Sequence, residues 1–195
     1  LIMASGRAHG AHGGAGAILG LEFAGEVVET GGQVTGIKAG DRVMCSGNAG
    51  YAEYAVTDYG RVAKIPANNM SFTQAATLPI ALQTMHNALV TAGRLKKGES
   101  VLIQGASSGV GIMGMQIAKF MGAALVIGSS TNEGRRACLK EFGADLAIDT
   151  KDPGWADAVV KATDGKGVDL IVDQISAPVA NGNLKAAKVL GRIVN

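Results

Sequence analysis

The sequence predicts an α/β fold class in which a doubly wound parallel sheet is accompanied by a smaller all-β part. The second half of the chain alternates short apolar runs with helical patterns, which favours parallel pairing of the strands. These runs lack polar alternation, as expected for strands covered on both faces. The first half has short alternating segments between Gly- and Asn-containing turns, which is typical of a small all-β module.

The elements of the second half follow one another in a regular order. Strands are predicted at residues 100–103, 125–128, 146–148, 168–173 and 192–194. Helices are predicted at residues 109–121, 132–142, 153–163 and 179–190, the first of them apolar nearly all round and therefore buried. This alternation makes a Rossmann sheet. Because such a sheet normally has six strands and five are counted, we expect an incomplete one.

The first half is organised differently. Its strands are predicted at residues 23–30, 41–44 and 51–56. A helical segment over residues 71–91, interrupted at Pro79, links this module to the sheet. We therefore divide the chain into a substrate domain over residues 1–72 and a nucleotide-binding domain over residues 73–195, with the substrate meeting the cofactor between them.

The most informative segment is the turn after the first strand of the sheet. Small residues there let a backbone approach a pyrophosphate, and the amides of the following helix N-terminus suit a phosphate. As a G-x-G-x-x-G motif the turn is imperfect, because Ala106 and Ser108 occupy two of the glycine positions. We expect dinucleotide contacts from Gly105, Ala106, Ser108, Gly109, Val110 and Gly111.

The residues after the second strand bear on cofactor choice. A site that prefers NAD normally places Asp or Glu there, to accept hydrogen bonds from the ribose 2′-hydroxyl, whereas this chain has Ser130. Arg135 and Arg136 follow closely and favour the 2′-phosphate of NADPH, although Glu133 argues mildly against it. Consecutive helical residues point about 100° apart, so one of the two arginines is expected to contact the phosphate; a solvated helix face is the alternative for both.

Six motifs resemble the medium-chain dehydrogenase/reductase superfamily in their order and approximate spacing. They occupy residues 20–28, 38–43, 50–54, 75–79, 105–111 and 142–145, and the resemblance covers nearly the whole chain. More narrowly, the chain is similar to the zinc-independent quinone oxidoreductase branch. The resemblance implies that the first domain is GroES-like and that both domains are incomplete here.

The resemblance also implies an activity and further site residues. It implies hydride transfer from NADPH to a small-molecule quinone or α,β-unsaturated carbonyl, with Thr84 near the nicotinamide. Asp173 and Gln174 end the fourth strand at the carboxyl edge, where ligands bind in such sheets. A helix residue that bonds its own backbone is the alternative for Thr84. The residues indicate no catalytic proton donor, and they leave the substrate open.

No metal site is predicted. Zinc dehydrogenases of the same superfamily carry a ligating histidine where this chain has Leu21, and a cysteine-rich lobe where it has only Cys45. A catalytic zinc needs three protein ligands and a structural zinc four, and neither set can be assembled. His9 and His12 stand three apart among glycines and alanines, which indicates a solvated loop, and His86 is expected to pack or cap within its helix.

Composition excludes several partners. The net charge of +2 is dispersed, with no basic stripe for nucleic acid, and no apolar run has the length of a membrane span. Two unpaired cysteines favour a reducing cytoplasm. Two other functions remain open: the same motifs resemble enoyl reductase modules of polyketide synthases, and a non-catalytic NADPH-binding protein would look alike.

The ends of the chain carry one more expectation. If the chain ended at Asn195, the strand at residues 192–194 would be an open apolar edge that pairs with another chain. We therefore expect residues 1–195 alone to self-associate without reductase activity. In the resembling family a sixth strand pairs across a two-fold axis, which implies a homodimer for a longer form.

Overall fold

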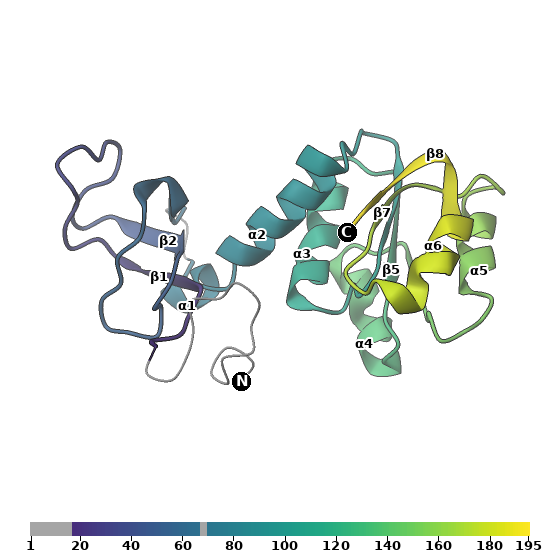
Figure 1. Cartoon of the computed structure of the whole chain (residues 1–195), viewed down its shortest axis with the longest axis horizontal. Coiled ribbons are helices and arrows are strands. Elements are labelled where there is room, and N and C mark those ends of the chain that lie inside the picture. The colour runs from purple at the N-terminus through teal and green to yellow at the C-terminus, as the bar shows by residue number, and fades with distance from the viewer. Residues whose placement is uncertain (1–16, 67–69) are drawn as a thin grey trace. The chain divides into compact units, whose positions relative to one another are not determined.

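The computed structural model describes residues 17–66 and 70–195 (Figure 1). The chain divides into two compact units, Leu1–Ile80 and Ala81–Asn195. The first contains a three-stranded sheet and the second a five-stranded sheet with helices. The predicted combination of a Rossmann sheet with a small β part is confirmed.

The small sheet is antiparallel, in the order β1-β2-β3. Its strands are β1 (Glu22–Glu26), β2 (Arg42–Ser46) and β3 (Val62–Lys64). Arg42 begins the central strand β2 and holds the segment that leads into the first helix, because its guanidinium donates to the Met70 carbonyl at 2.8 Å and stacks 4.6 Å from the Phe72 ring centroid. The sequence prediction placed two of these strands.

The predicted strand over residues 51–56 is wrong. Residues 51–54 form bends, and Tyr51 and Tyr54 are 80% and 75% exposed. The local pairing consists of Gly50 and Tyr51 amides that donate to the Gly20 and Leu19 carbonyls. Alternation favours a strand only where one face is buried against a neighbour. The third strand is instead β3, whose sequence is too short to show a period.

The large sheet is parallel throughout, in the order β6-β5-β4-β7-β8. Its strands are β4 (Ser100–Ile103), β5 (Leu125–Ser129), β6 (Leu146–Ile148), β7 (Val168–Val172) and β8 (Ala187–Val194). The chain runs outward from β4 through β5 to β6 and then returns to the other side with β7. The strand order therefore reverses between β4 and β7, where Rossmann sheets bind their ligands.

Helices cover both faces of this sheet (Figure 1). They are α3 (Gly109–Phe120), α4 (Glu133–Ala137) with a 3-10 continuation (Cys138–Phe142), α5 (Trp155–Ala162) and α6 (Ala180–Ala186). Successive residues of β4 enter opposite cores: Ile103 packs with Met115 of α3, and Leu102 packs with Trp155 of α5. Each such buried side chain contributes roughly 1.5–3 kcal/mol, so both layers hold the sheet.

Helix α3 is buried on one face only, which corrects the expectation that it is buried nearly all round. Its buried residues are Gly111, Gly114, Met115 and Ala118, whereas Phe120 is 90% exposed. A Cβ on Gly114 would lie 2.9 Å from the sulfur of Met85, so this glycine makes room for a neighbouring helix. Helix α3 belongs to a single layer of helices on its face of the sheet. Its far side is therefore not covered, although that side is also apolar.

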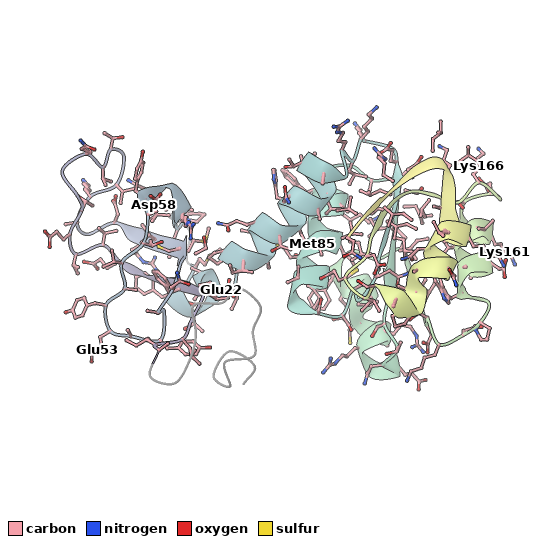
Figure 2. All side chains as sticks on the ribbon, in the orientation of Figure 1. Glu22, Glu53, Asp58, Met85, Lys161 and Lys166 are labelled. Carbon is pink, nitrogen blue, oxygen red and sulfur yellow. The ribbon has the colours of Figure 1, made fainter. Side chains whose placement is uncertain are left out.

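The helical segment at residues 71–91 is three elements. They are α1 (Phe72–Ala75), α2 (Pro79–His86) and the π-helical turn η2 (Asn87–Ala92). A capping box between Ser71 and Gln74 begins α1. Pro79, predicted as an interruption, is the first residue of α2, where its missing N–H matters least. Met85 of α2 lies beside α3 (Figure 2).

Two helix ends differ from their predictions. Helix α5 starts at Trp155 rather than Pro153, because the Asp152 carboxylate accepts from the Gly154 amide in the preceding turn. The last helix ends at Ala186, and Ala187 already pairs with Val168 in the sheet. The register then shifts, so the apolar residues Val189 and Leu190, which suggested a longer helix, are 87% and 96% exposed.

Among the described residues, no helix combines the length with the apolar character that crossing a bilayer requires.

Candidate dinucleotide site

The turn after β4 is shaped by two glycines with different roles. Gly105 has a φ of 66°, which glycine adopts without strain. A Cβ on Gly111 would lie 2.6 Å from the Ala106 Cα and from the Gly105 carbonyl oxygen, so no side chain fits there. Gly109 has open space where its Cβ would be. Close packing of helix α3 on the turn therefore depends on Gly111, the role of the last glycine in dinucleotide motifs.

Ala106 and Ser108 explain why the motif departs from three glycines. Ala106 is fully buried and faces Gly128 of β5. A Cβ added to Gly128 would lie 3.0 Å from the Cβ of Ala106. Ser108 is the N-cap of α3: its hydroxyl accepts from the Gly111 amide at 3.0 Å and donates to the Gly105 carbonyl at 2.9 Å. The amides of Gly109 and Val110, at the start of α3, have no acceptor within the helix, and such free donors at a helix N-terminus suit an anion.

Ser130 and the two arginines follow β5. Ser130 is 5% exposed, and its hydroxyl lies 2.9 Å from the Ser107 hydroxyl of the glycine turn. Nη1 of Arg136 donates to the Ser130 carbonyl and to Oδ2 of Asp149, both at 2.9 Å. Arg135 is exposed, and its guanidinium makes no hydrogen bond or ion pair with the described residues. The structure thus separates an arginine held by the protein from one that is free.

Thr84 and Gln174 are exposed and belong to different elements. Thr84 lies on α2, and its hydroxyl bonds to none of the described residues. Gln174 follows β7, and its Nε2 donates to the Gln104 carbonyl at 3.2 Å. The Gln174 side chain therefore reaches the turn after β4 from the other side of the strand reversal.

Asp173 is not arranged as a direct ligand. It is 6% exposed, and its Oδ1 accepts from the amides of Ile175 at 2.8 Å and Ser176 at 2.9 Å. Its Oδ2 accepts from Nδ2 of Asn183 at 2.9 Å. With both oxygens engaged inside the protein, the carboxylate fixes the turn that follows β7 rather than offering itself to a ligand.

Three buried polar residues of this edge were missed by the sequence analysis. Gln104, Ser129 and Asn183 are all at most 2% exposed and bond to one another or to Asp173. Gln104 and Ser129 each end or directly follow a buried strand, which is the signal that would have found them. Asn183 gave no such signal, because a polar residue in a short helix is ordinarily solvated.

The described residues hold no group of three or more His, Cys, Asp or Glu side chains placed to bind a metal ion. Leu21 is 41% exposed, and His86 is exposed at the end of α2 rather than packed. Cys45 is buried, and burial raises the pKa of its thiol, which disfavours the thiolate that ligates metals. His9 and His12 lie outside the described residues.

Comparisons with known proteins agree with this geometry. Two family models match in succession: the alcohol dehydrogenase GroES-like domain over residues 2–67, and the zinc-binding dehydrogenase over residues 109–195. A quinone oxidoreductase of Pongo abelii is 33% identical over 177 residues, which are 90% of this chain and 53% of that protein. This chain therefore spans about half the length of that relative.

Two further matches widen the comparison. The reducing polyketide synthase hmp8 of Hypomyces subiculosus is 31% identical over 90% of this chain, which corresponds to 8% of that protein. The structure of mycobacterial Rv1454c complexed with NADPH superposes with a TM-score of 0.82 and 29% identity, covering 91% of this chain and 56% of that one.

The sheet, the glycine turn and these matches define a class. The chain belongs to the medium-chain dehydrogenase/reductase superfamily of oxidoreductases. Within that superfamily it belongs to the quinone oxidoreductase-like branch.

Proposed function

We propose that the protein binds NADPH and transfers hydride to a quinone or an α,β-unsaturated carbonyl, without zinc. The observation that carries the proposal is the carboxyl edge of the parallel sheet. There a tight glycine turn opens onto the N-terminus of α3, next to a serine where NAD-preferring sites carry a carboxylate. Relatives that include quinone oxidoreductases support the same reaction class.

Each part of the dinucleotide has residues suited to it. The pyrophosphate fits the amides at Gly109 and Val110, where helix geometry leaves donors free. A 2′-phosphate fits near Ser130, with Arg135 as its cation, because Arg136 is already engaged by Asp149. Gln174 and Thr84 are assigned to the nicotinamide end. The cofactor supplies the hydride, and the protein orients it and excludes water.

Zinc independence is part of the proposal. It rests on Leu21, which cannot ligate a metal, and on the raised thiol pKa of buried Cys45. The domain assignment, residues 1–72 for substrate and 73–195 for cofactor, belongs to it as well, as do the homodimer and the cytoplasmic location.

A second candidate is an enoyl reductase module of a polyketide synthase, which would reduce a carrier-bound thioester. The matched segments of fungal polyketide synthases favour it, because they are nearly as similar to this chain as the quinone oxidoreductases are. Both candidates reduce a conjugated carbon–carbon bond or a quinone with the same cofactor. They differ in whether the acceptor is free or attached to a carrier.

The test is a nucleotide titration followed by a substrate panel. Fluorescence enhancement of NADPH and NADH on binding gives the two dissociation constants, and we expect tighter binding of NADPH. Oxidation of NADPH is then measured with quinones, free enones and enoyl thioesters on a form of the protein longer than residues 1–195, because those residues alone are expected to lack reductase activity. Reduction of quinones or free enones supports the first candidate, and reduction of thioesters alone supports the second. Binding with no turnover of any acceptor would indicate a non-catalytic NADPH-binding protein, and equal binding of both nucleotides would contradict the cofactor preference.

A further inference from the structure

A chain of buried hydrogen bonds crosses the sheet where its strand order reverses. The Gly105 amide donates to Oγ of Ser129 at 3.0 Å, and that hydroxyl donates to Oε1 of Gln104 at 2.6 Å. Nε2 of Gln104 donates to Oδ1 of Asn183 at 2.7 Å, and Nδ2 of Asn183 donates to Oδ2 of Asp173 at 2.9 Å. We call Ser129, Gln104, Asn183 and Asp173 the amide network.

The amide network joins elements that are far apart in the sequence. Gln104 follows β4, Ser129 ends β5, Asp173 follows β7, and Asn183 lies on α6. All four side chains are buried, and among the described residues no buried side-chain nitrogen or oxygen lacks a partner. A fully satisfied buried network fixes one geometry, because any displacement leaves a polar group unpaired away from water.

One end of the network holds a strained turn. Ser176 has φ 67° and ψ −127°, a region in which residues other than glycine are strained. The Asp173 carboxylate keeps it there by accepting from the Ser176 and Ile175 amides. Strain of this kind persists only where surrounding contacts over-determine the backbone, and here the two contacts to the amides of the turn come from Asp173 of the network.

The same turn touches the glycine turn at the network's other end. A Cβ on Gly105 would lie 3.0 Å from Cδ1 of Ile175, and Nε2 of Gln174 donates to the Gln104 carbonyl. The two turns that flank the strand reversal are therefore linked twice, directly by the side chains of Ile175 and Gln174 and indirectly through the buried amide network. A dinucleotide that lies across the reversal meets both turns.

We propose that Gln104, Ser129 and Asn183 are positioning residues that lock the glycine turn and the turn at residues 174–176 in one arrangement for dinucleotide binding. The inference rests on the proposed function. It goes further in assigning cofactor affinity to residues that are buried and do not touch the cofactor. Asp173 acts in the same way, through the amides of Ile175 and Ser176.

The sheet offers a matched control for the test. Ser129→Ala removes the hydroxyl between Gly105 and Gln104 at the carboxyl edge. Ser100→Ala removes a hydroxyl that donates to Oδ2 of Asp169 at 2.9 Å, at the amino edge of the same sheet. Both changes delete one hydrogen-bonding oxygen from a strand residue and are expected to lower stability. Only Ser129→Ala is expected to weaken NADPH binding, by about tenfold at equal folded fraction.

A rescue experiment separates positioning from general destabilisation. Asn183→Leu keeps a similar volume but breaks the link between Gln104 and Asp173, and it is expected to weaken NADPH binding by about tenfold or more. Ser176→Gly relieves the strained backbone, because glycine adopts that conformation freely. In the double variant we expect Ser176→Gly to recover most of the lost affinity.

Fluorescence titration of the full chain with NADPH, alongside urea unfolding to fix the folded fraction, measures all variants. If the unmutated chain binds neither NADPH nor NADH, the proposed function fails and the inference with it. If it binds, and Ser129→Ala binds as tightly as Ser100→Ala, the inference alone is overturned. Failure of Ser176→Gly to restore affinity to a folded Asn183→Leu variant overturns the coupling between the two turns. If Asn183→Leu does not fold, the serine pair decides.

Discussion

The two edges of the large parallel sheet are built from different chemistry. At the strand reversal the carboxyl edge is held by neutral amides and hydroxyls: Gln104, Ser129 and Asn183 link the strand ends around one engaged carboxylate. The Arg136–Asp149 ion pair of this edge lies farther out, after β5 and β6. The amino edge is held by charges: Lys188 pairs with Asp169 at 2.8 Å and Arg192 with Glu99 at 2.6 Å. Side chains at the amino edge are also more exposed.

The difference follows from what each edge must leave free. Ion pairs suit an edge with no ligand, since partly exposed pairs tolerate water and add modest stability. An anionic dinucleotide requires unpaired amide donors, and uncompensated negative charges beside them would disturb its binding. Apart from the engaged Asp173 carboxylate, the network that fixes the turns is neutral, and all of its hydrogen bonds stay inside the protein. Function is thus expected to be sensitive to changes at the carboxyl edge, and acid stability to changes at the amino edge.

Gly111→Ala is expected to have the largest effect at the carboxyl edge. The added Cβ would meet backbone atoms of Gly105 and Ala106 at 2.6 Å, so the turn or helix α3 must move. We expect roughly 2–4 kcal/mol of destabilisation and loss of measurable NADPH binding. Gly109→Ala, two residues earlier with open space around it, should change the unfolding free energy by less than about 1 kcal/mol. Urea unfolding of both variants checks the contrast; equal stability would show that the turn is not closely packed.

Arg135→Ala and Arg136→Ala test cofactor preference at the same edge. Arg135 is free, so its loss should weaken NADPH binding by about 1.5–3 kcal/mol, roughly ten- to a hundredfold, with little change for NADH. Arg136 holds the Ser130 carbonyl and Asp149, so its loss should lower stability and weaken both nucleotides alike. Parallel titrations measure this. A selective NADPH loss in Arg136→Ala instead would reverse the assignment.

Asp169→Asn tests the amino edge through pH. Burial acts to raise the pKa of the Asp169 carboxyl, but hydrogen bonds from Lys188 and Ser100 outweigh it and the pKa lies below its ordinary value. A lowered folded-state pKa contributes stability that is present above the unfolded carboxyl pKa of about 3.9 and is lost as the pH falls through the folded value. The unmutated chain should therefore lose more stability between pH 6 and acid conditions, on the order of pH 3, than Asp169→Asn does.

Unfolding midpoints of both proteins across that range measure the effect. The Asn variant should be the less stable one near neutral pH, and NADPH binding there should be unchanged. If both proteins lose the same stability as the pH falls, Asp169 does not contribute to acid sensitivity. If Asp169→Asn binds NADPH more weakly, the two edges do not differ in function as proposed.

Chelation is expected to have the smallest effect. The described residues of neither unit assemble a metal site, so treatment with a chelator should leave NADPH oxidation within error of the untreated value. Elemental analysis of the purified protein should find no stoichiometric zinc. One zinc per chain, removed together with activity, would contradict the proposed zinc-independent mechanism.

The sequence by itself determined the parallel sheet and its glycine turn. Mostly apolar runs such as residues 100–103 and 168–172, alternating with helical patterns, predict strands covered on both faces, and the small residues at 105–111 predict the tight turn. Local pattern was misleading at residues 51–56 and 187–190. An alternating segment such as residues 51–56 forms a strand only where a neighbouring strand pairs with it. At residues 187–190 the helical pattern continues, but the pairing of Ala187 with Val168 ends the helix.

Tertiary structure alone decided which polar groups are engaged. Nothing in the sequence distinguishes Arg135 from Arg136, but Asp149 lies within 2.9 Å of one of them. Asp173 occupies a ligand-binding edge in the sequence, yet folding brings Asn183 and the amides of residues 175 and 176 to its oxygens. Hydrophobic periodicity is local and is written into the chain, whereas hydrogen-bond partners such as Gln104 and Asn183, 79 residues apart, are fixed only when the sheet brings the strand ends together.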